Sequence, residues 1–412
     1  MFRAYDNSTL FKEKIYVALL TSIQVFNILD FVIILPMGPM LMRYFEITPL
    51  QFATLASSYN ISSAALSFFY SSFADKFDRK KLLLVALFGF ILSTFFCAIA
   101  PNYFTFLSAR IIAGIFGGIL TPCTYAIVTE LIPFERRGKA LGTIMASFSL
   151  TSVLGVPVGL FIANHFGWRH SFHFIGASST IVFICNYFIL PLIPKVNKSF
   201  APIEVLKRMF SIMTNKEYLI GFLTITCFSF SGFLIFPFFS TYSVLNVGIL
   251  ETDLTYIYLF GGLFTVVSSK FAGKYTDQFG SMAVYYPTLM GSILFTFLFT
   301  HAGHLNLVTL LIISTGFMML VNARLVPVMK LLTEIPKIDD RGSFMGILMS
   351  VRSLGAAGAT FIAGFIIKEV DKKFVNFDLV GMLSIAISLI SILFVLKINK
   401  NIIEGAKNAS RS

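Results

Sequence analysis

One carboxylate lies where a membrane protein could use it to move a proton. Of the twenty acidic residues in the chain, only Asp30 falls inside a long apolar segment, the run from residue 15 to residue 41. In a helix it would lie about 22 Å from the start of that run, within a hydrocarbon layer about 30 Å thick. A charge there costs about 2.5 to 3.5 kcal/mol, so the side chain should face a cavity, pair with a cation or carry a proton. This position predicts ion-coupled transport.

Three arginines, Arg110, Arg324 and Arg352, also lie inside apolar segments. One acid against three guanidinium groups favours a neutral, zwitterionic or anionic substrate, because arginine pairs with carboxylates and phosphates. Arg324 lies near one end of its segment, where snorkelling to the surface is an equal alternative. Arg352 lies near the middle of its segment. It would contact substrate there or bond to carbonyl groups in the glycine-rich stretch 355–358.

Neutral polar side chains in the apolar segments supply further candidates for substrate contact. Asn27 lies about one turn before Asp30 and shares its helix face. Tyr59 and Asn322 are polar enough to line a cavity with Arg352. Each of them has hydrogen bonding between helices as the alternative role.

The elements that must position these residues are membrane helices. The chain has 412 residues, is 56% hydrophobic and only 13% charged, which excludes an ordinary soluble domain. We predict an all-α membrane protein with twelve spans. They cover about 15–41, 50–72, 82–100, 103–129, 139–163, 171–193, 217–241, 254–272, 282–300, 304–329, 342–367 and 375–397.

The distribution of charge predicts the orientation of the spans. The net charge is +12, and 24 of the 32 Lys and Arg residues lie in the segments that are cytoplasmic if the N-terminus is inside. Five lie in the opposite loops, and the other three are the arginines inside the spans. This asymmetry places both termini in the cytoplasm and requires an even number of spans. The basic residues therefore indicate topology and a lipid bilayer, and no nucleic acid is expected.

The two halves of the chain repeat one another. Asp75 and Asp277 follow corresponding spans 202 residues apart, and the Arg-Gly pairs at 137–138 and 341–342 are 204 residues apart. Ordered matches at nearly one offset indicate duplication. We predict two pseudo-symmetric six-helix bundles, at residues 1–193 and 217–412, joined by a cytoplasmic linker at 194–216. Substrate would bind between them at the midplane.

At these loops the chain resembles the major facilitator superfamily and, within it, the twelve-span drug:proton antiporters. The loop after the second span carries the most specific motif. Its matching residues are Asp75, Lys76, Arg79 and Lys80, and the second copy keeps Gly273, Asp277 and Gly280. Weaker matches are Arg110 with Gly114 in span 4, Gly155-Val-Pro157-Val-Gly159 in span 5, and Asp30 to Pro39 in span 1.

The resemblance implies roles for two constellations. Spans 1 and 4 would face the central cavity, so that Asp30 and Arg110 form the proton-coupling site. A guanidinium favours the ionised carboxylate and burial favours the protonated form. A static ion pair is the alternative. Asp75 would close the cytoplasmic side or simply cap a turn. The resemblance implies that Arg79, Glu130, Arg137 and Asp277 act with Asp75 in gating.

Small residues predict where helices approach closely. Gly114 and Gly118 are four residues apart, as are Gly155 and Gly159, and we predict tight packing at both pairs. Pro157 removes a backbone donor and would let span 5 bend. The four cysteines and five histidines have no metal-ligand spacing, so neither a metal nor a cofactor is expected.

The leading prediction is a proton-coupled exporter of a small amphipathic compound in a bacterial inner or plasma membrane, and we expect it to act as a monomer. The alternative is an importer, facilitator or anion exchanger of the same fold for a sugar, carboxylate or siderophore-like solute. A membrane sensor without transport is a third class. An enzyme is not expected, because the sequence has no pattern of nucleophile, metal or cofactor.

Overall fold

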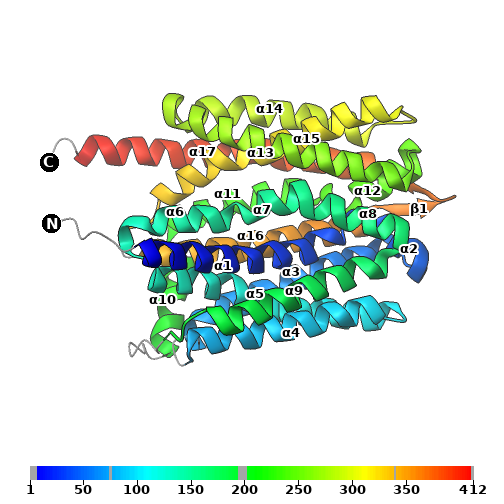
Figure 1. Cartoon of the computed structure of the whole chain (residues 1–412). Coiled ribbons are helices and arrows are strands. Elements are labelled where there is room, and N and C mark those ends of the chain that lie inside the picture. The colour runs from blue at the N-terminus through cyan, green and yellow to red at the C-terminus, as the bar shows by residue number, and fades with distance from the viewer. Residues whose placement is uncertain (1–6, 74–76, 194–201, 338–339, 410–412) are drawn as a thin grey trace.

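A computed structural model describes residues 7–73, 77–193, 202–337 and 340–409 (Figure 1). In chain order its elements are α1 (Asn7–Ile33), α2 (Gly38–Phe45), α3 (Pro49–Phe73), α4 (Arg79–Ile99), α5 (Tyr103–Leu131), α6 (Phe134–Met145), α7 (Ser147–Leu150), η2 (Thr151–Gly155), α8 (Val156–Phe166), α9 (Trp168–Ile189), α10 (Pro202–Thr214), α11 (Lys216–Phe233), η3 (Phe236–Phe238), α12 (Phe239–Tyr242), η4 (Ser243–Val247), η5 (Glu251–Asp253), α13 (Leu254–Phe279), α14 (Ser281–Thr300), α15 (Leu307–Glu334), α16 (Arg341–Ile366), β1 (Lys368–Val370), β2 (Lys373–Val375) and α17 (Phe377–Ala409).

The helices confirm an all-α membrane protein. Eleven helical stretches in the described part of the chain are long and apolar enough to cross a membrane. The predicted span at 50–72 is not one of them, although it is the 25-residue helix α3. Its serines, Asn60 and Gln51 lower its hydropathy. At 1.5 Å per residue α3 is about 37 Å long, so it still has the length of a spanning helix.

The first predicted span, 15–41, is wrong in its extent. Helix α1 ends at Ile33, a turn follows, and α2 begins at Gly38. Pro36 has no backbone N–H and cannot continue the hydrogen-bond ladder, which accounts for the break. Asp30 is therefore in the last turn of α1 rather than in the middle of one long helix.

The fifth predicted span, 139–163, consists of several helical pieces. The α-helical path changes to the π-helix η2 at Thr151–Gly155, and Pro157 follows at the start of α8. A proline at this position lacks the donor that an unbroken ladder would use, and π-turns frequently mark functional sites. The irregular backbone faces α13 of the other half, where Gly262 would bring an added Cβ to 2.5 Å from the Ser152 carbonyl oxygen.

Two predicted connectors contain structure that the sequence analysis did not assign. The linker 194–216 includes the helix α10, whose Met209 and Ile212 are buried, while residues 194–201 lie outside the described part. The loop between α16 and α17 forms an antiparallel hairpin of β1 and β2. Asp371 and Lys372 at its tip both have positive φ, as a two-residue type I′ turn requires.

The helices form two groups that share one apolar core at one end only. Both termini lie at the left in Figure 1, and the hairpin lies at the opposite end. At the hairpin end one core joins both halves, with Ile34 and Phe52 from the first and Phe238 and Phe239 from the second. At the terminal end, the buried residues that the structure describes form a separate core in each half, and Phe68 of the first half packs against the core of the second. The halves are therefore closed against one another at the hairpin end.

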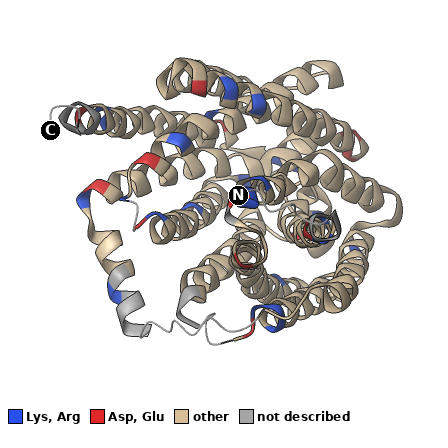
Figure 2. Cartoon of the chain, turned by 60° about the vertical axis from the view of Figure 1, so that its left-hand side comes forward, with Lys and Arg blue, Asp and Glu red and all other residues tan. Residues whose placement is uncertain are grey.

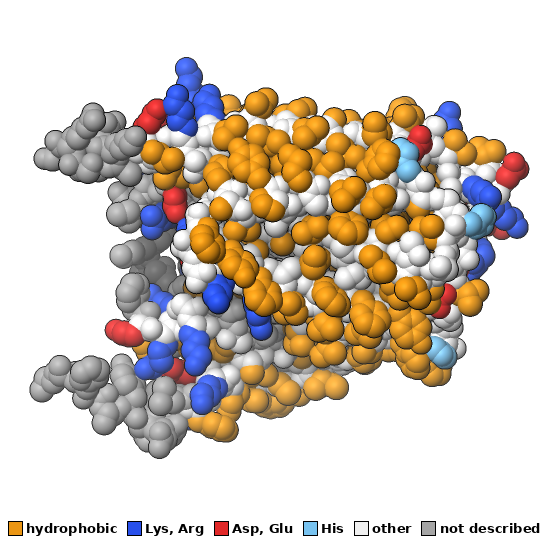
Figure 3. Space-filling model, turned by 90° about the horizontal axis from the view of Figure 1, so that it is seen from above, with side chains coloured by type: hydrophobic (Ala, Val, Ile, Leu, Met, Phe, Trp, Pro, Cys, Tyr) orange, Lys and Arg blue, Asp and Glu red, His pale blue; other side chains and the backbone are white. Residues whose placement is uncertain are grey.

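The surface matches a membrane setting. Figure 3 shows a broad apolar belt between two ends that carry the charged side chains. Figure 2 turns the terminal end toward the viewer and shows Lys and Arg on several helix ends there. Since a bilayer accepts apolar side chains in its hydrocarbon layer, the belt is the part that contacts lipid.

Candidate functional site

A cavity of about 160 Å³ lies between the two halves. Its walls come from α1, the fifth-span pieces α7, η2 and α8, and from α11, η3, α13, α15 and α16. Several of its lining residues, Leu35, Val156, Tyr258, Met318 and Val321, also belong to the core shared by both halves. The cavity is thus directly beneath the closed hairpin end, at the middle of the long helices.

The cavity wall is mostly apolar and aromatic. Of the predicted substrate-contact residues, Asn322 and Arg352 line it, and Asn27 and Tyr59 do not. Asn322 donates a hydrogen bond of 2.9 Å to the Met318 carbonyl of its own helix. Arg352 is partly buried near the middle of α16. The structure thus divides the four predicted contacts between the cavity and the interior of the first half.

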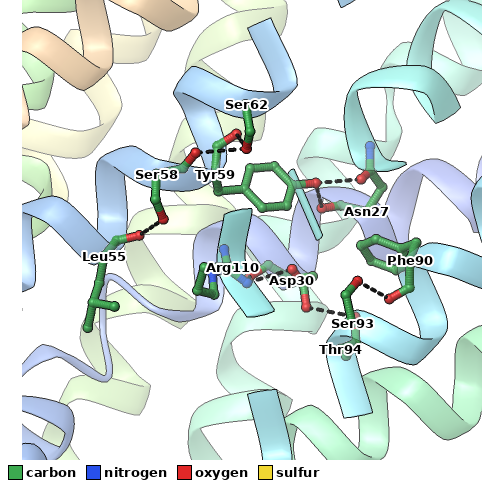
Figure 4. Close-up of polar contacts among 10 residues, drawn as sticks. All are labelled: Asn27, Asp30, Leu55, Ser58, Tyr59, Ser62, Phe90, Ser93, Thr94 and Arg110. Atoms are coloured by element: carbon green, nitrogen blue, oxygen red, sulfur yellow. Dashed lines mark hydrogen bonds and ion pairs between the residues drawn. The ribbon is translucent and has the colours of Figure 1, made fainter. Parts of the chain in front are cut away.

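Asp30 and Arg110 form a fully buried ion pair in the first half (Figure 4). Arg110 Nη1 donates to Asp30 Oδ2 at 2.6 Å and to the Asp30 carbonyl oxygen at 3.1 Å. Thr94 Oγ1 of α4 donates to the other carboxylate oxygen, Oδ1, at 3.1 Å. Arg110 Nε and Nη2 have no partner among the described residues. The pair therefore joins α1, α4 and α5, and in this conformation it does not line the cavity.

Tyr59 connects this ion pair to the cavity wall. The Arg110 guanidinium lies 4.8 Å from the centre of the Tyr59 ring, and the Tyr59 hydroxyl donates to Asn27 Oδ1 at 2.6 Å. Phe31 stacks on the Tyr59 ring, with ring centroids 5.5 Å apart. Phe31 also stacks on Phe233 of the second half, at 6.5 Å. A chain of packed rings thus runs from the buried charges to the inter-half cavity.

Arg324 is buried in the second half and does not snorkel, so that alternative is wrong. Only 2% of the residue is exposed. Its guanidinium donates hydrogen bonds to three serine hydroxyls, those of Ser231 at 2.9 Å, Ser388 at 3.2 Å and Ser292 at 3.3 Å. It lies 5.2 Å from the ring centre of Phe228, which lines the cavity. No carboxylate pairs with it among the described residues.

Some of the predicted gating residues form ion pairs in the structure. Arg79 Nε donates to Glu130 at 2.6 Å, which links the start of α4 to the end of α5. Arg137 donates to the Ile132 carbonyl oxygen at 2.8 Å. In the second half Asp277 pairs with Lys330 at 2.8 Å. Asp75 lies outside the described residues.

The small-residue positions lie at helix contacts. A Cβ at Gly114 would be 2.6 Å from the Tyr59 carbonyl oxygen, and one at Gly118 would clash with the backbone of Ser63. Gly155 and Gly159 instead face α1, and the nearest atoms belong to Leu29 and Ile33. Gly114 and Gly118 therefore let α5 approach α3, while the other pair brings the fifth span against the helix that carries Asp30.

The closed end carries an ion pair that the sequence analysis missed. Arg43 of α2 makes two hydrogen bonds to the Glu251 carboxylate, at 2.6 and 3.2 Å, and so connects the two halves. The hydrogen bond with Glu251 raises the pKa of Arg43. The two residues are 208 positions apart in the sequence, and no sequence pattern marks them as a pair. Phe31 was missed for a similar reason, since a phenylalanine in an apolar helix carries no signal of its own.

The fold and the cavity together define a class of protein. Two groups of membrane helices, closed at one end around a midplane cavity, are the architecture of a carrier that exposes one site alternately to two sides.

The comparisons identify the family. The model of the Major Facilitator Superfamily matches residues 20–360, and the chain belongs to that family. It is therefore a multi-pass membrane transporter of a small molecule and not an enzyme.

Known relatives and solved structures agree with this assignment. A Bacillus subtilis (strain 168) protein, the uncharacterized MFS-type transporter YceJ, is 23% identical over 343 residues, which cover 82% of this chain and 85% of that protein. Multidrug resistance protein 3 of the same organism is 35% identical over 141 residues, 34% of this chain and 27% of that protein. A bacterial homologue of the human lysosomal transporter Spinster, in an inward-facing and occupied conformation, superposes with a TM-score of 0.74 at 15% identity, covering 93% of this chain and 96% of that one. A D-xylose–proton symporter gives 0.73 at 16% identity, covering 93% and 97%.

Proposed function

We propose that this chain is a proton-coupled transporter that exports a small amphipathic compound by alternating access. The observation that carries the proposal is the position of Asp30. Its carboxylate forms a fully buried ion pair with Arg110, and the next residue in the chain, Phe31, lines the cavity. In this proposal the bundles 1–193 and 217–412 rock about the linker 194–216. Both termini face the cytoplasm of a bacterial membrane, and a single copy of the chain suffices.

The arrangement of the cores supports a cytoplasm-facing conformation. The shared core and the Arg43–Glu251 pair close the end opposite the termini. At the terminal end the cores of the two halves are separate, and we infer that the halves part there, with Phe68 leaving the core of the second half. Rocking would break the shared core and the ion pair, and join the halves at the terminal end instead. The predicted gating pairs would then act on the side that carries the termini.

The proton step follows from the surroundings of Asp30. With Arg110 at 2.6 Å the ionised carboxylate is compensated, whereas separation of the pair would leave a buried charge that favours proton uptake. A substrate that displaces Phe31 would push on Tyr59, which covers the Arg110 guanidinium. Binding at the cavity would thereby change the proton occupancy of Asp30 without direct contact.

Two observations favour export over import. The fifth-span sequence Gly155-Val-Pro157-Val-Gly159 partly matches a pattern associated with export; its Val156 lines the cavity, and its two glycines pack against α1. Two relatives that match part of the chain bear the names multidrug resistance protein 2 and 3. These observations support efflux as the direction.

Proton flux in everted membrane vesicles tests the proposal. Vesicles would be energised, and the pH gradient followed with a fluorescent amine while dansylamide, Nε-dansyl-lysine or naphthalene-2-sulfonate is added as the neutral, zwitterionic or anionic probe. We expect at least one probe to release protons from vesicles with the wild-type chain, and Asp30→Asn to abolish that release. The matched control is Glu404→Gln, an exposed acid at the end of α17. Substrate-driven proton release that survives in Asp30→Asn would end the coupling proposal.

A second candidate is a facilitator or anion exchanger of the same fold, for a sugar, carboxylate or siderophore-like solute. The observation that favours it is Arg352, a cation on the cavity wall. Flux that ignores the pH gradient and collapses in Arg352→Ala would support this candidate instead.

A further inference from the structure

We propose that the central cavity binds the oxyanion of a small aromatic amphiphile, a carboxylate or sulfonate, through Arg352. This inference rests on the proposed transport function and names the substrate class of the same site. It assigns the charged end of the substrate to α16 and its apolar body to the aromatic walls.

The charge of the cavity comes from one side chain. Of the nineteen residues that line it, Arg352 alone carries a formal charge. The guanidinium has neither a hydrogen bond nor an ion pair with any described residue. Helix α16 is continuous from Arg341 to Ile366, so the carbonyl groups of 355–358 are engaged in its own ladder. The alternative of a guanidinium bonded to those carbonyls has no support here. An unpaired cation at an apolar cavity is a binding site for an anion.

The neighbouring charges reinforce this preference. Asp30 is the one acid of the predicted spans that does not lie at a span end, and it is already paired with Arg110. Arg324 does not line the cavity but lies 5.2 Å from the ring centre of the cavity-lining Phe228, and its hydrogen-bond partners among the described residues are hydroxyl groups. The field in the cavity is therefore positive from both Arg352 and Arg324. A lipophilic cation would meet repulsion without a compensating carboxylate.

The walls fix the apolar part of the ligand. Phe31 and Phe148 come from the first half, and Phe228, Phe233 and Phe236 from the second. Phe31 and Phe233 already face one another across the halves, with centroids 6.5 Å apart and planes inclined by 24°. An aromatic ring of the ligand would pack against these side chains, because aromatic groups prefer offset-stacked or edge-to-face contacts. Ser229 and Asn322 add polar side chains to the lining of the same cavity.

The contribution of charge to binding can be measured with three probes that share one ring system and differ in charge. They are naphthalene-2-sulfonate, naphthalene-2-sulfonamide and 2-naphthyltrimethylammonium. Their equilibrium binding to the purified full-length chain in nanodiscs would be measured by naphthalene fluorescence at equal pH on both sides. We expect the sulfonate to bind about 10- to 100-fold more tightly than the sulfonamide, as for one hydrogen-bonded charge pair. The ammonium compound should bind most weakly.

Variants assign the preference to Arg352. Arg352→Gln should bring the sulfonate to the affinity of the sulfonamide and leave the sulfonamide unchanged, while Arg352→Lys should retain part of the preference. Lys270→Gln is the matched control, because it removes an exposed cation of α13 that does not line the cavity. Its sulfonate affinity should equal that of the wild type.

Three results would overturn the assignment. These are equal binding of sulfonate and sulfonamide to the wild type, an unchanged preference in Arg352→Gln, or no binding of the sulfonate at roughly millimolar concentration. The assay uses no gradient, so its result is independent of proton coupling. Loss of proton flux in Asp30→Asn with a retained sulfonate preference would support both proposals. If one test fails, the result of the other can still be interpreted.

Discussion

Each half of the molecule buries an arginine on its fourth long helix, but only one of them meets a carboxylate. Arg110 of α5 reaches Asp30 of α1, which also accepts from Thr94 of α4. Arg324 of α15 reaches Ser231 of α11 and Ser292 of α14, the corresponding helices of the second half, together with Ser388 of α17. The duplicated frame is thus conserved within the chain while its chemistry differs. Among the described residues, the buried arginine of the first half has a carboxylate partner, whereas that of the second half has hydroxyl partners only.

The position of the cavity follows the same asymmetry. Tyr59 fills the space next to Arg110 in the first half. Counted forward by the 202 residues that separate the two loop aspartates, its counterpart is Gly261, which lines the cavity together with Gly262. Tyr59 therefore packs beside the ion pair in the first half, whereas in the second half the Met318 side chain occupies the space that a Cβ at Gly261 would need. Most of the cavity lining comes from the second half, and in our proposal the proton chemistry belongs to the first.

The largest effect is expected from Arg110→Met. This change leaves the Asp30 carboxylate fully buried with one hydroxyl donor, and removal of one partner of a buried pair costs about 3 to 5 kcal/mol. The free energy of unfolding would be measured by SDS titration in mixed micelles. A thiol-reactive dye provides the readout, because Cys97 and Cys123 are buried in the folded chain.

The double variant Asp30→Leu with Arg110→Met is the control for that loss. It removes both charges, and apolar replacement of a buried pair is often neutral or stabilising. We expect it to recover most of the stability while abolishing proton coupling. A double variant as unstable as Arg110→Met alone would contradict the view that the uncompensated carboxylate is the cause.

An intermediate effect is expected from Tyr59→Phe. The ring still covers Arg110, but Asn27 Oδ1 loses the donor at 2.6 Å and is left buried, at a cost of about 1 to 3 kcal/mol. The matched change in the second half is Tyr258→Phe, whose hydroxyl lies 2.9 Å from the Ser240 hydroxyl. The same unfolding assay should show a smaller loss there, because Ser240 can turn to another acceptor. Equal losses would remove Tyr59 from any special role beside the ion pair.

The sequence predicts the frame better than the site. Hydropathy and the repeated loops suffice for the class and the superfamily, because every membrane helix must satisfy its backbone internally and so leaves a long apolar signal. The same signal is weaker in α3, where polar residues packed between helices lower the hydropathy, and it misplaces the end of the first span, where apolar residues continue through the break at Pro36. Length and apolarity alone do not show whether a run is one helix.

Contacts between distant segments set the remaining limit. Asp30 and Arg110 stand out in the sequence because charges are rare in apolar runs, and the structure pairs them. Arg324 stands out equally, yet its serine partners come from three helices and serines are common throughout. Phe31 and the Arg43–Glu251 pair carry no local signal at all. Such partners depend on the packing of the folded chain, which one sequence does not reveal.

The smallest effect is expected from Arg324→Met, and it tests the comparison most directly. Two of its partners already donate to their own helices, Ser231 to the Phe228 carbonyl and Ser292 to the Leu289 carbonyl, so they keep partners when the guanidinium is removed. The change also removes a buried charge that has no carboxylate among the described residues. We expect a change in the free energy of unfolding within about 1 kcal/mol, of either sign, because lost hydrogen bonds offset the relief of desolvation. A loss as large as that of Arg110→Met would mean that an anion compensates Arg324 in the working protein. In that case the stability of the wild type, and not of the variant, should rise with chloride concentration.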